Sequence, residues 1–167
     1  MILKTYTLIH VLISLLAILS GLIVMGGLLT AKRLNGWTKL FLTTTILTSA
    51  TGFFFPFRGV TPALVVGVVS IVALGVAAFA RYQRQLAGVW RNAYVACAVL
   101  ALYLNVLVLI VQAFSKIPAL KEMAPTQTEP SFKITQLAVL VAFIISAVVA
   151  AIRFRAESVS PILETKI

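Results

Sequence analysis

The chain has 167 residues, of which 61% are hydrophobic and 11% are charged, and it carries a formal net charge of +10. A soluble domain is nearer half apolar and about a quarter charged. This composition therefore excludes an ordinary soluble fold and favours a bundle in a bilayer, where apolar side chains can face lipid. The basic residues flank the apolar runs, which is typical of membrane topology and headgroup contact and argues against nucleic-acid binding.

The first apolar run, 6–29, predicts an uncleaved transmembrane helix. It is too long for the apolar part of a signal peptide, no small-residue cleavage site follows it, and it stops at Lys32 and Arg33. At about 1.5 Å per residue it crosses a hydrocarbon core of roughly 30 Å with length to spare. Small and polar residues recur on one of its faces at helical spacing: His10, Ser14, Ala17 and Gly21.

The second run, 38–55, is expected to follow a turn at Asn35-Gly36 and to end at Pro56. From Phe41 onward it carries five threonines: Thr43, Thr44, Thr45, Thr48 and Thr51. In lipid, a threonine hydroxyl bonds back to the carbonyl one turn earlier or across to a neighbouring helix for about 0.6 kcal/mol. Thr44 and Thr48 share one face, which serves either helix packing or a groove lined by hydroxyls.

Three further runs, 63–80, 92–114 and 134–152, predict three more transmembrane helices, each with small residues at helical spacing that suit close packing. The short connection 57–62 makes the second and third helices an antiparallel hairpin. The segment 81–91 is basic and contains tyrosine and tryptophan, which is typical of a connector at the headgroup level.

The loop 115–133 lies between the last two predicted helices. Pro118, Pro125 and Pro130 favour extended structure over helix in this loop. The loop is either a plain connector or a docking segment for a larger membrane complex, since its length and extended character suit both.

Five runs predict an all-α bundle of five transmembrane helices that forms a single membrane domain over 1–167, with the termini on opposite sides. One side holds nine basic residues: Lys32, Arg33, Lys39, Arg81, Arg84, Arg91, Arg153, Arg155 and Lys166. The other side holds five: Lys4, Arg58, Lys116, Lys121 and Lys133. The positive-inside rule then places the N-terminus outside, the loop 115–133 in the extracytoplasmic space and the tail 153–167 in the cytoplasm.

Two segments carry a resemblance: LFLTTTILTSATGFFFPF, Leu40 to Phe57, and PALKEMAPTQTEPSF, Pro118 to Phe132. They resemble segments of small multi-pass bacterial inner-membrane proteins of unknown function, and the similarity extends over most of the chain. Neither segment contains a motif with an identifiable chemistry. The resemblance therefore implies a location in the bacterial inner (plasma) membrane and nothing about activity.

The candidate site lies near the outer surface, where His10 and Arg58 are expected at similar depth. Arg58 follows the aromatic segment FFFPF. It either snorkels to the headgroups or grips a phosphate or carboxylate head beneath an aromatic shelf that includes Phe54. The tail of such a ligand would lie in a groove lined by three threonines: Thr44, Thr48 and Thr51.

Ser14, Asn105 and Gln112 are predicted to form a polar interior of the bundle, because an amide in mid-helix is expected to face protein rather than lipid. Hydrogen bonds between helices account for such residues, and the alternative is the lining of a small cavity. The single cysteine, Cys97, has no partner in the chain for a disulfide or a metal site. It is expected to pack as a small, mildly polar residue.

The chain lacks a Ser/His/Asp set, metal-ligand spacing and a glycine-rich phosphate loop, so the sequence favours a non-enzymatic protein. The leading hypothesis is a membrane module that binds a lipid-like or quinone-like molecule, or an accessory subunit of a membrane complex. Membrane lipids and other copies of the chain are its further predicted partners. One alternative is an oligomeric transporter or channel with a polar path: Thr44, Thr48, Asn105 and Gln112. Another is a haem-binding electron-transfer subunit that uses His10 and either an axial ligand from another chain or a five-coordinate iron. No other cofactor and no metal site is predicted.

Overall fold

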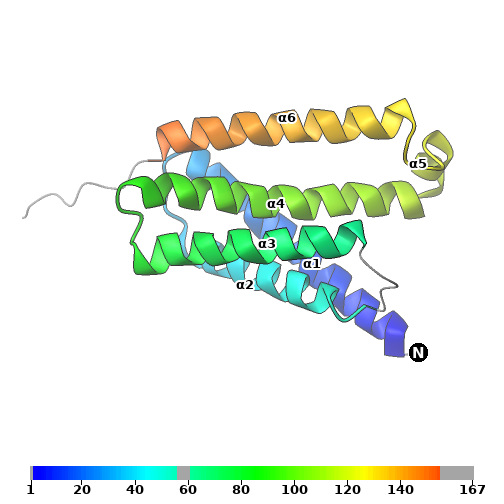
Figure 1. The fold of residues 1–167 in the computed structure, drawn as a ribbon, viewed down its shortest axis with the longest axis horizontal. Helices are drawn as coiled ribbons and strands as arrows, with labels where there is room; N and C mark the ends of the chain where they lie inside the picture. Colours follow the sequence, from blue (N-terminus) through cyan, green and yellow to red (C-terminus); the bar gives the residue numbers. More distant parts are fainter. Residues whose placement is uncertain (1, 56–60, 155–167) are drawn as a thin grey trace, which may run out of the picture.

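The computed structural model describes residues 2–55 and 61–154, and this part of the chain is helical without strands. Its elements are α1 (Ile2–Leu29), α2 (Asn35–Gly52), α3 (Pro62–Ala78), the π-helical segment η1 (Phe79–Gln83), α4 (Val89–Lys116), α5 (Pro118–Met123) and α6 (Pro130–Arg153). In Figure 1, α4 and α6 lie side by side, while α1 crosses them obliquely and its N-terminal half swings away. Because α4 also packs against α3 and α1, it is the central helix.

The bundle has two ends with different contents (Figure 1). The α5 end holds α5, the start of α1, the end of α2, the start of α3 and the end of α4. The basic end holds η1, the starts of α2 and α4, and the ends of α1 and α6. The described basic residues of the basic end are Lys32, Arg33, Lys39, Arg81, Arg84, Arg91 and Arg153.

Four helical segments of the described chain are long and apolar enough to cross a membrane: Leu3–Leu29, Pro62–Gln83, Val89–Lys116 and Pro130–Arg153. This is the pattern of a multi-pass membrane protein, and the predicted all-α class is confirmed. α2 is not among these segments, because its threonines together with Asn35 and Lys39 lower its hydropathy. The fifth crossing and the orientation of the termini remain predictions.

The turn before α2 comes earlier than expected. Ala31 takes a left-handed backbone conformation with φ of 58°, and the amide of Lys32 donates to the carbonyl of Gly27 at 2.8 Å. This arrangement satisfies a free carbonyl and ends α1. The Asn35-Gly36 pair therefore begins α2, and the prediction of a turn there is wrong.

The helix predicted over 38–55 ends before its proline. α2 stops at Gly52, where the amide of Phe53 donates to the carbonyl of Ala50 at 3.2 Å in a tighter, 3₁₀-type turn. Pro56, which was expected to end this helix, lies outside the described residues. The aromatic residues that follow Gly52 therefore no longer follow the angular spacing of the helix. The direction of their rings depends on the turn instead.

Two of the three prolines in the segment 115–133 begin helices where extended structure was expected, so the prediction is wrong for these two, while Pro125 lies in a turn. Pro118 opens α5 and Pro130 opens α6 in the first turn. At that position the missing N–H is not needed by the helix, and the fixed φ of proline suits it. The predicted loop is therefore a short helix flanked by two turns.

The segment 81–91 begins inside η1 and has the basic, aromatic character expected of a headgroup-level connector. The guanidinium carbon of Arg84 lies 5.2 Å from the centroid of the Trp90 indole and 5.8 Å from the centroid of the Phe79 ring. The two rings themselves meet edge to face at 5.1 Å. Cation–π contacts of this kind fix the guanidinium against the aromatic surface.

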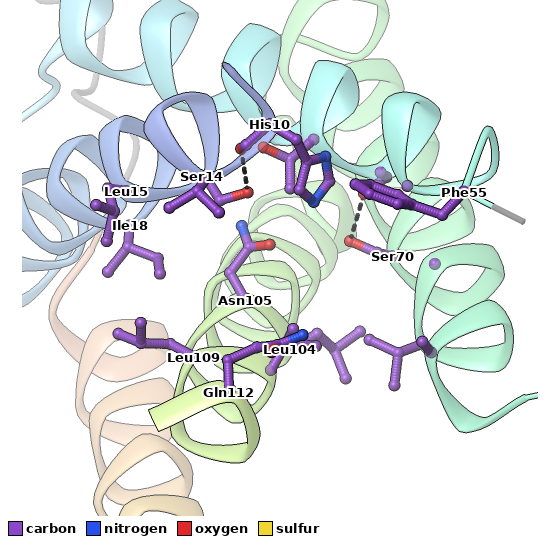
Figure 2. A pocket seen from close by; sticks show the side chains of 18 of the residues that line it. His10, Ser14, Leu15, Ile18, Phe55, Ser70, Leu104, Asn105, Leu109 and Gln112 are labelled. Carbon is purple, nitrogen blue, oxygen red and sulfur yellow. Dashed lines mark hydrogen bonds between the residues drawn. The ribbon is translucent and has the colours of Figure 1, made fainter. Parts of the chain in front are cut away.

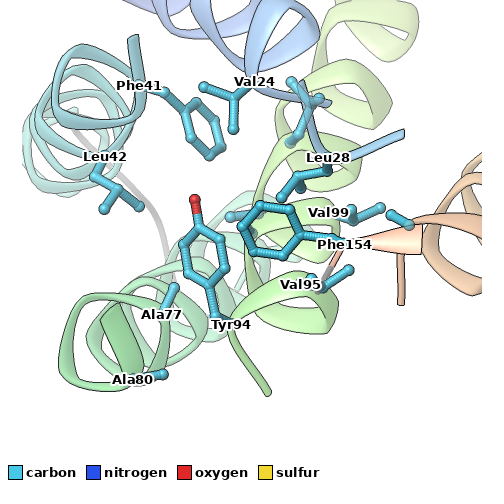
Figure 3. Close-up of a cluster of buried hydrophobic side chains, with 14 of the residues drawn as sticks. Val24, Leu28, Phe41, Leu42, Ala77, Ala80, Tyr94, Val95, Val99 and Phe154 are labelled. Carbon is cyan, nitrogen blue, oxygen red and sulfur yellow. The ribbon is translucent and has the colours of Figure 1, made fainter. Parts of the chain in front are cut away.

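The basic end is filled by an apolar core, which Figure 3 shows from close by. Tyr94, Phe154 and Phe41 are each 1% exposed, and the Tyr94 and Phe154 rings lie with their centroids 6.2 Å apart. The guanidinium carbon of Arg81 lies 5.3 Å from the centroid of Tyr94, and Cys97 packs half-buried against the core. In lipid the hydrophobic effect does little to join helices, so close packing of this kind holds the bundle through dispersion.

The small and polar stripe of α1 is used in two ways. In its second half, a Cβ added to Gly21 would lie 2.5 Å from Cδ1 of Leu102 and 2.8 Å from the Phe41 ring. Only glycine therefore allows α1 to approach α2 and α4 so closely here. In its first half α1 has moved away from the bundle axis, and His10 and Ser14 face a cavity instead.

Candidate functional site

A cavity of about 630 Å³ lies at the α5 end, between α1, α2, α3 and α4. Figure 2 shows His10 from α1 and Asn105 from α4 pointing into it from opposite sides. Most of its wall is apolar: Val11, Leu15, Ile18, Phe53, Phe55, Leu64, Val66, Leu104, Val108, Leu109 and Ile117. Its polar side chains are Thr7, His10, Ser14, Thr48, Ser49, Ser70, Asn105, Gln112 and Lys116. Apolar walls with a few placed polar groups are typical of a site for a small molecule.

The rim of the cavity faces outward between α1 and α4. Val11 and Leu15 of α1 are each 39% exposed, and Leu109 of α4 is 40% exposed. In a helix that crosses a membrane, these exposed apolar side chains lie against lipid tails. The cavity is therefore bordered by an exposed apolar surface.

His10 is held in place by α2 and by an aromatic ring. Its Nδ1 lies 2.8 Å from Oγ1 of Thr51, and the Tyr6 hydroxyl, one helical turn earlier, donates to the Thr51 carbonyl at 2.6 Å. The Phe55 ring packs edge to face on the imidazole, with centroids 5.1 Å apart, and also contacts Tyr6. These contacts fix both the position and the plane of the imidazole.

The other polar side chains of the cavity differ in how they are satisfied. The Ser14 hydroxyl bonds back to the carbonyl of His10 at 2.8 Å, and Ser49 donates to Ser70 across α2 and α3 at 3.3 Å. The Thr48 hydroxyl oxygen is buried and has no hydrogen-bond partner among the described residues. An unpaired buried hydroxyl is costly, so Thr48 is the least satisfied of these polar groups.

The structure brings five of the nine predicted site residues to the cavity: His10, Ser14, Thr48, Asn105 and Gln112. Thr51 stands behind His10 and holds it through the hydrogen bond to Nδ1. The prediction for Arg58 falls outside the described residues. The binding role of all these residues remains a prediction.

Two predicted residues lie away from the cavity. The Thr44 hydroxyl is buried and donates to the carbonyl of Leu40 at 2.8 Å, so Thr44 closes its own helical turn. Phe54 is 80% exposed and points outward, whereas its neighbours Phe53 and Phe55 line the cavity. The reason is the end of α2 at Gly52, after which the chain turns and alternates its aromatic side chains between the cavity and the surroundings.

Sequence reasoning did not assign Tyr6, Ser49 or Phe55 to the site. Tyr6 lies one turn before His10 on the same helical face, and this spacing could have linked them. Ser49 could not have been separated from the many other hydroxyl residues of its helix. Phe55 depended on the turn after α2, which no sequence signal specified.

The described residues contain no group of three or more His, Cys, Asp or Glu side chains that could hold a metal ion. The haem hypothesis concerns His10 with a ligand from another chain, so it remains a prediction. A visible spectrum of the purified protein tests it directly. Comparisons with models of known protein families, with curated proteins and with solved structures find no match to this chain.

Proposed function

We propose that the protein is an inner-membrane module that binds a lipid-like or quinone-like amphiphile in the cavity at the α5 end. The observation that carries the proposal is the shape and chemistry of this cavity. It has apolar walls for a tail, a polar group of His10, Thr48 and Asn105 for a head, and a rim of exposed apolar side chains between α1 and α4. A volume of about 630 Å³ lies within the range of roughly 300–1,000 Å³ that is usual for ligand pockets.

The same proposal includes five membrane crossings, with the N-terminus outside and the C-terminus in the cytoplasm. α2 has 18 residues, which span about 27 Å at 1.5 Å per residue, close to the hydrocarbon thickness of roughly 30 Å. It packs between α1 and α3, so Thr38, Thr44 and Thr45 are shielded from lipid by neighbouring helices. The concentration of basic residues at the basic end supports placing that end in the cytoplasm.

In this orientation the cavity lies in the outer half of the membrane. A ligand would enter from the outer leaflet between α1 and α4, with its tail along Val11, Leu15 and Leu109. Its head would reach the polar group beside His10. The absence of a carboxylate in the lining favours a ligand without a cationic head, since a buried cation needs a charged partner.

The test is identification of the molecules that copurify with the protein. The protein is extracted in a mild detergent, and its bound small molecules are detected by native mass spectrometry and identified after organic extraction. We expect one class of amphiphile at a stoichiometry near one per chain. Retention of only bulk phospholipid, in the proportions of the membrane, would refute the proposal.

A matched pair of variants ties the bound molecule to the cavity. Gly52→Leu adds a side chain beside His10, because a Cβ at Gly52 lies 3.9 Å from Cε1 of that ring and meets nothing closer. Gly75→Leu is the control, since a Cβ at Gly75 has open space around it and α3 is exposed there. We expect the Gly52→Leu variant to lose the bound molecule and the Gly75→Leu variant to retain it.

A further inference from the structure

We propose that the site selects an amphiphile whose head donates a hydrogen bond, such as a long-chain phenol, quinol or alcohol, over the matching quinone or ether. This inference rests on the proposed function and defines its ligand more closely. It follows from the hydrogen-bond polarity of the His10 imidazole. Nδ1 of His10 is hydrogen-bonded to Thr51, which leaves Nε2 as an acceptor for a donor on the ligand.

The first step concerns the hydroxyl proton of Thr51. Its Oγ1 lies 2.7 Å from the carbonyl oxygen of Leu47 and 3.2 Å from that of Thr48. Carbonyl oxygens only accept hydrogen bonds, so the single hydroxyl proton is directed to this side. The Thr51 oxygen must therefore accept the hydrogen bond from His10, and Nδ1 of the imidazole carries the proton.

The second step concerns the other ring nitrogen. A neutral imidazole with a proton on Nδ1 has a lone pair on Nε2. Among the described residues, no hydrogen bond involves Nε2, and no carboxylate lines the cavity to favour an imidazolium. The edge-to-face contact with Phe55 fixes the ring plane, so the acceptor is held in one direction.

A second acceptor faces the first across the cavity. The side-chain nitrogen of Asn105 donates one of its two protons to Oγ1 of Thr45 at 3.5 Å, so its amide oxygen is left as an acceptor for a ligand. Figure 2 shows the Asn105 side chain opposite His10. The second proton on the Asn105 amide nitrogen can donate to the ligand oxygen. A hydroxyl head, which donates and accepts at once, complements this set.

The expected selectivity follows from the cost of an unmet acceptor. A site built to receive a hydroxyl proton rejects an analogue without it, because the buried polar group of the site is then left unpaired. That penalty is about 1–3 kcal/mol, which corresponds to a preference of roughly 5- to 150-fold. Nε2 is partly accessible in this half-buried side chain, so we expect the lower part of this range, near tenfold.

The first experiment reads the tautomer. His10 is the single histidine of the chain, so protein produced with histidine labelled at the ring nitrogens, and purified with a tag that lacks histidine, gives one pair of ring-nitrogen NMR signals. We expect a protonated Nδ1 and an unprotonated Nε2. A protonated Nε2 with a bare Nδ1 would overturn the inference regardless of any ligand.

The second experiment uses a matched pair of probes: a para-alkylphenol with a long chain and its methyl ether. The phenol is expected to bind about tenfold more tightly in calorimetric titrations and to shift the Nε2 signal, while the ether leaves that signal unchanged. Equal affinity of the two probes would overturn the inference and leave the proposed function standing. Failure of both probes to bind would overturn the inference, while the molecules that copurify with the protein would still decide the proposed function.

The variant His10→Phe separates the hydrogen bond from the shape of the site. We expect the preference for the phenol over the ether to disappear in this variant. An equal fall in affinity for both probes, with the preference retained, would show that His10 acts by shape and would overturn the inference. If this variant does not fold, the tautomer and the probe pair still decide the question in the wild-type protein.

Discussion

The two ends of this bundle are built from the same helices and pack in opposite ways. At the basic end the aromatic side chains of Phe41, Tyr94 and Phe154 fill the space between helices almost completely. At the α5 end, α1 diverges from α4, and polar groups line a cavity of about 630 Å³. The small and polar face of α1 therefore packs against other helices over its second half and lines a cavity over its first half.

The difference has a physical basis in Gly21. Without a Cβ, α1 can contact Phe41 and Leu102 directly, and this close approach fixes the crossing point of the helices. From such a crossing, an oblique helix must separate from its neighbours as it continues. His10, about three helical turns before Gly21 by the helical repeat of 3.6 residues, therefore lies where the helices are apart.

The largest expected effect is the loss of an aromatic ring at the filled end. Tyr94→Ala should lower the free energy of unfolding by about 3–5 kcal/mol, because the vacated space cannot collapse fully. Phe55→Ala, at the hollow end, should cost much less, since its ring already borders a cavity. Titration of each purified variant with a denaturing detergent measures both values, and equal losses would contradict the division into a filled and a hollow end.

Adding volume should give the opposite contrast. Gly21→Leu should destabilise the protein by about 1–3 kcal/mol through overpacking, whereas Gly52→Leu should change stability by no more than about 0.5 kcal/mol, as expected where no packed feature is disturbed. Thermal unfolding in detergent compares the two. A tolerated leucine at Gly21 would mean that the close approach of α1 is not what holds this crossing.

A smaller effect is expected from the hydroxyl that holds His10. Thr51→Val keeps the shape of the side chain and removes the hydrogen bond to Nδ1, which should cost about 0.6 kcal/mol of stability. The imidazole should then lose its single tautomer, so the ring-nitrogen NMR signals should shift toward a mixture. Thr44→Val is the matched control, because Thr44 bonds only within its own helix, and it should leave the signals of His10 in place.

The smallest effect concerns the turn that precedes α6 at the α5 end. Desolvation acts to raise the pKa of Glu129. Its carboxylate also accepts hydrogen bonds from its own backbone, from the amides of Thr126 and Thr128 and from the Thr126 hydroxyl, and these lower the pKa. The hydrogen bonds outweigh the desolvation, so the pKa lies below the ordinary value of 4.5. A lowered pKa means that the carboxylate stabilises the turn above pH 4.5 and that this contribution is lost as the pH falls through the folded-state pKa.

Hydrogen exchange of the Thr126 and Thr128 amides should therefore accelerate locally below that pKa, after correction for intrinsic exchange, while amides at the basic end stay protected. Glu129→Gln should show the faster exchange at neutral pH as well. Unchanged exchange in this variant would show that the carboxylate does not organise the turn.

Much of the architecture could be read from the sequence because hydropathy acts locally. The apolar runs, the basic residues between them and the small residues at helical spacing are sufficient to predict an all-α membrane bundle, and the ends of most helices fall within a few residues of the prediction. The prediction of extended structure at two prolines failed because proline disrupts the interior of a helix but is well suited to its first turn. Position within a helix is a property of the folded chain, and Pro118 and Pro130 occupy its start.

Within the candidate site, the sequence spacing predicted which residues share a helix face. It could not predict whether that face packs against a helix or lines the cavity. Thr44 and Thr48 share a face, yet Thr44 is buried against its own helix and Thr48 lines the cavity with an unpaired hydroxyl. Phe54 was chosen from an aromatic run in which its two neighbours are the lining residues. Both outcomes depend on where α1 and α4 diverge and where α2 ends.

The class of this protein follows from its sequence, since apolar composition and helical periodicity are properties of contiguous residues. The small number of polar groups and their places on helix faces follow from it as well. That His10, Thr51, Thr48 and Asn105 meet around one space follows from the folded bundle alone, because their distances depend on the crossing of α1 over the other helices. That crossing is set by contacts such as the one at Gly21, between residues far apart in the chain.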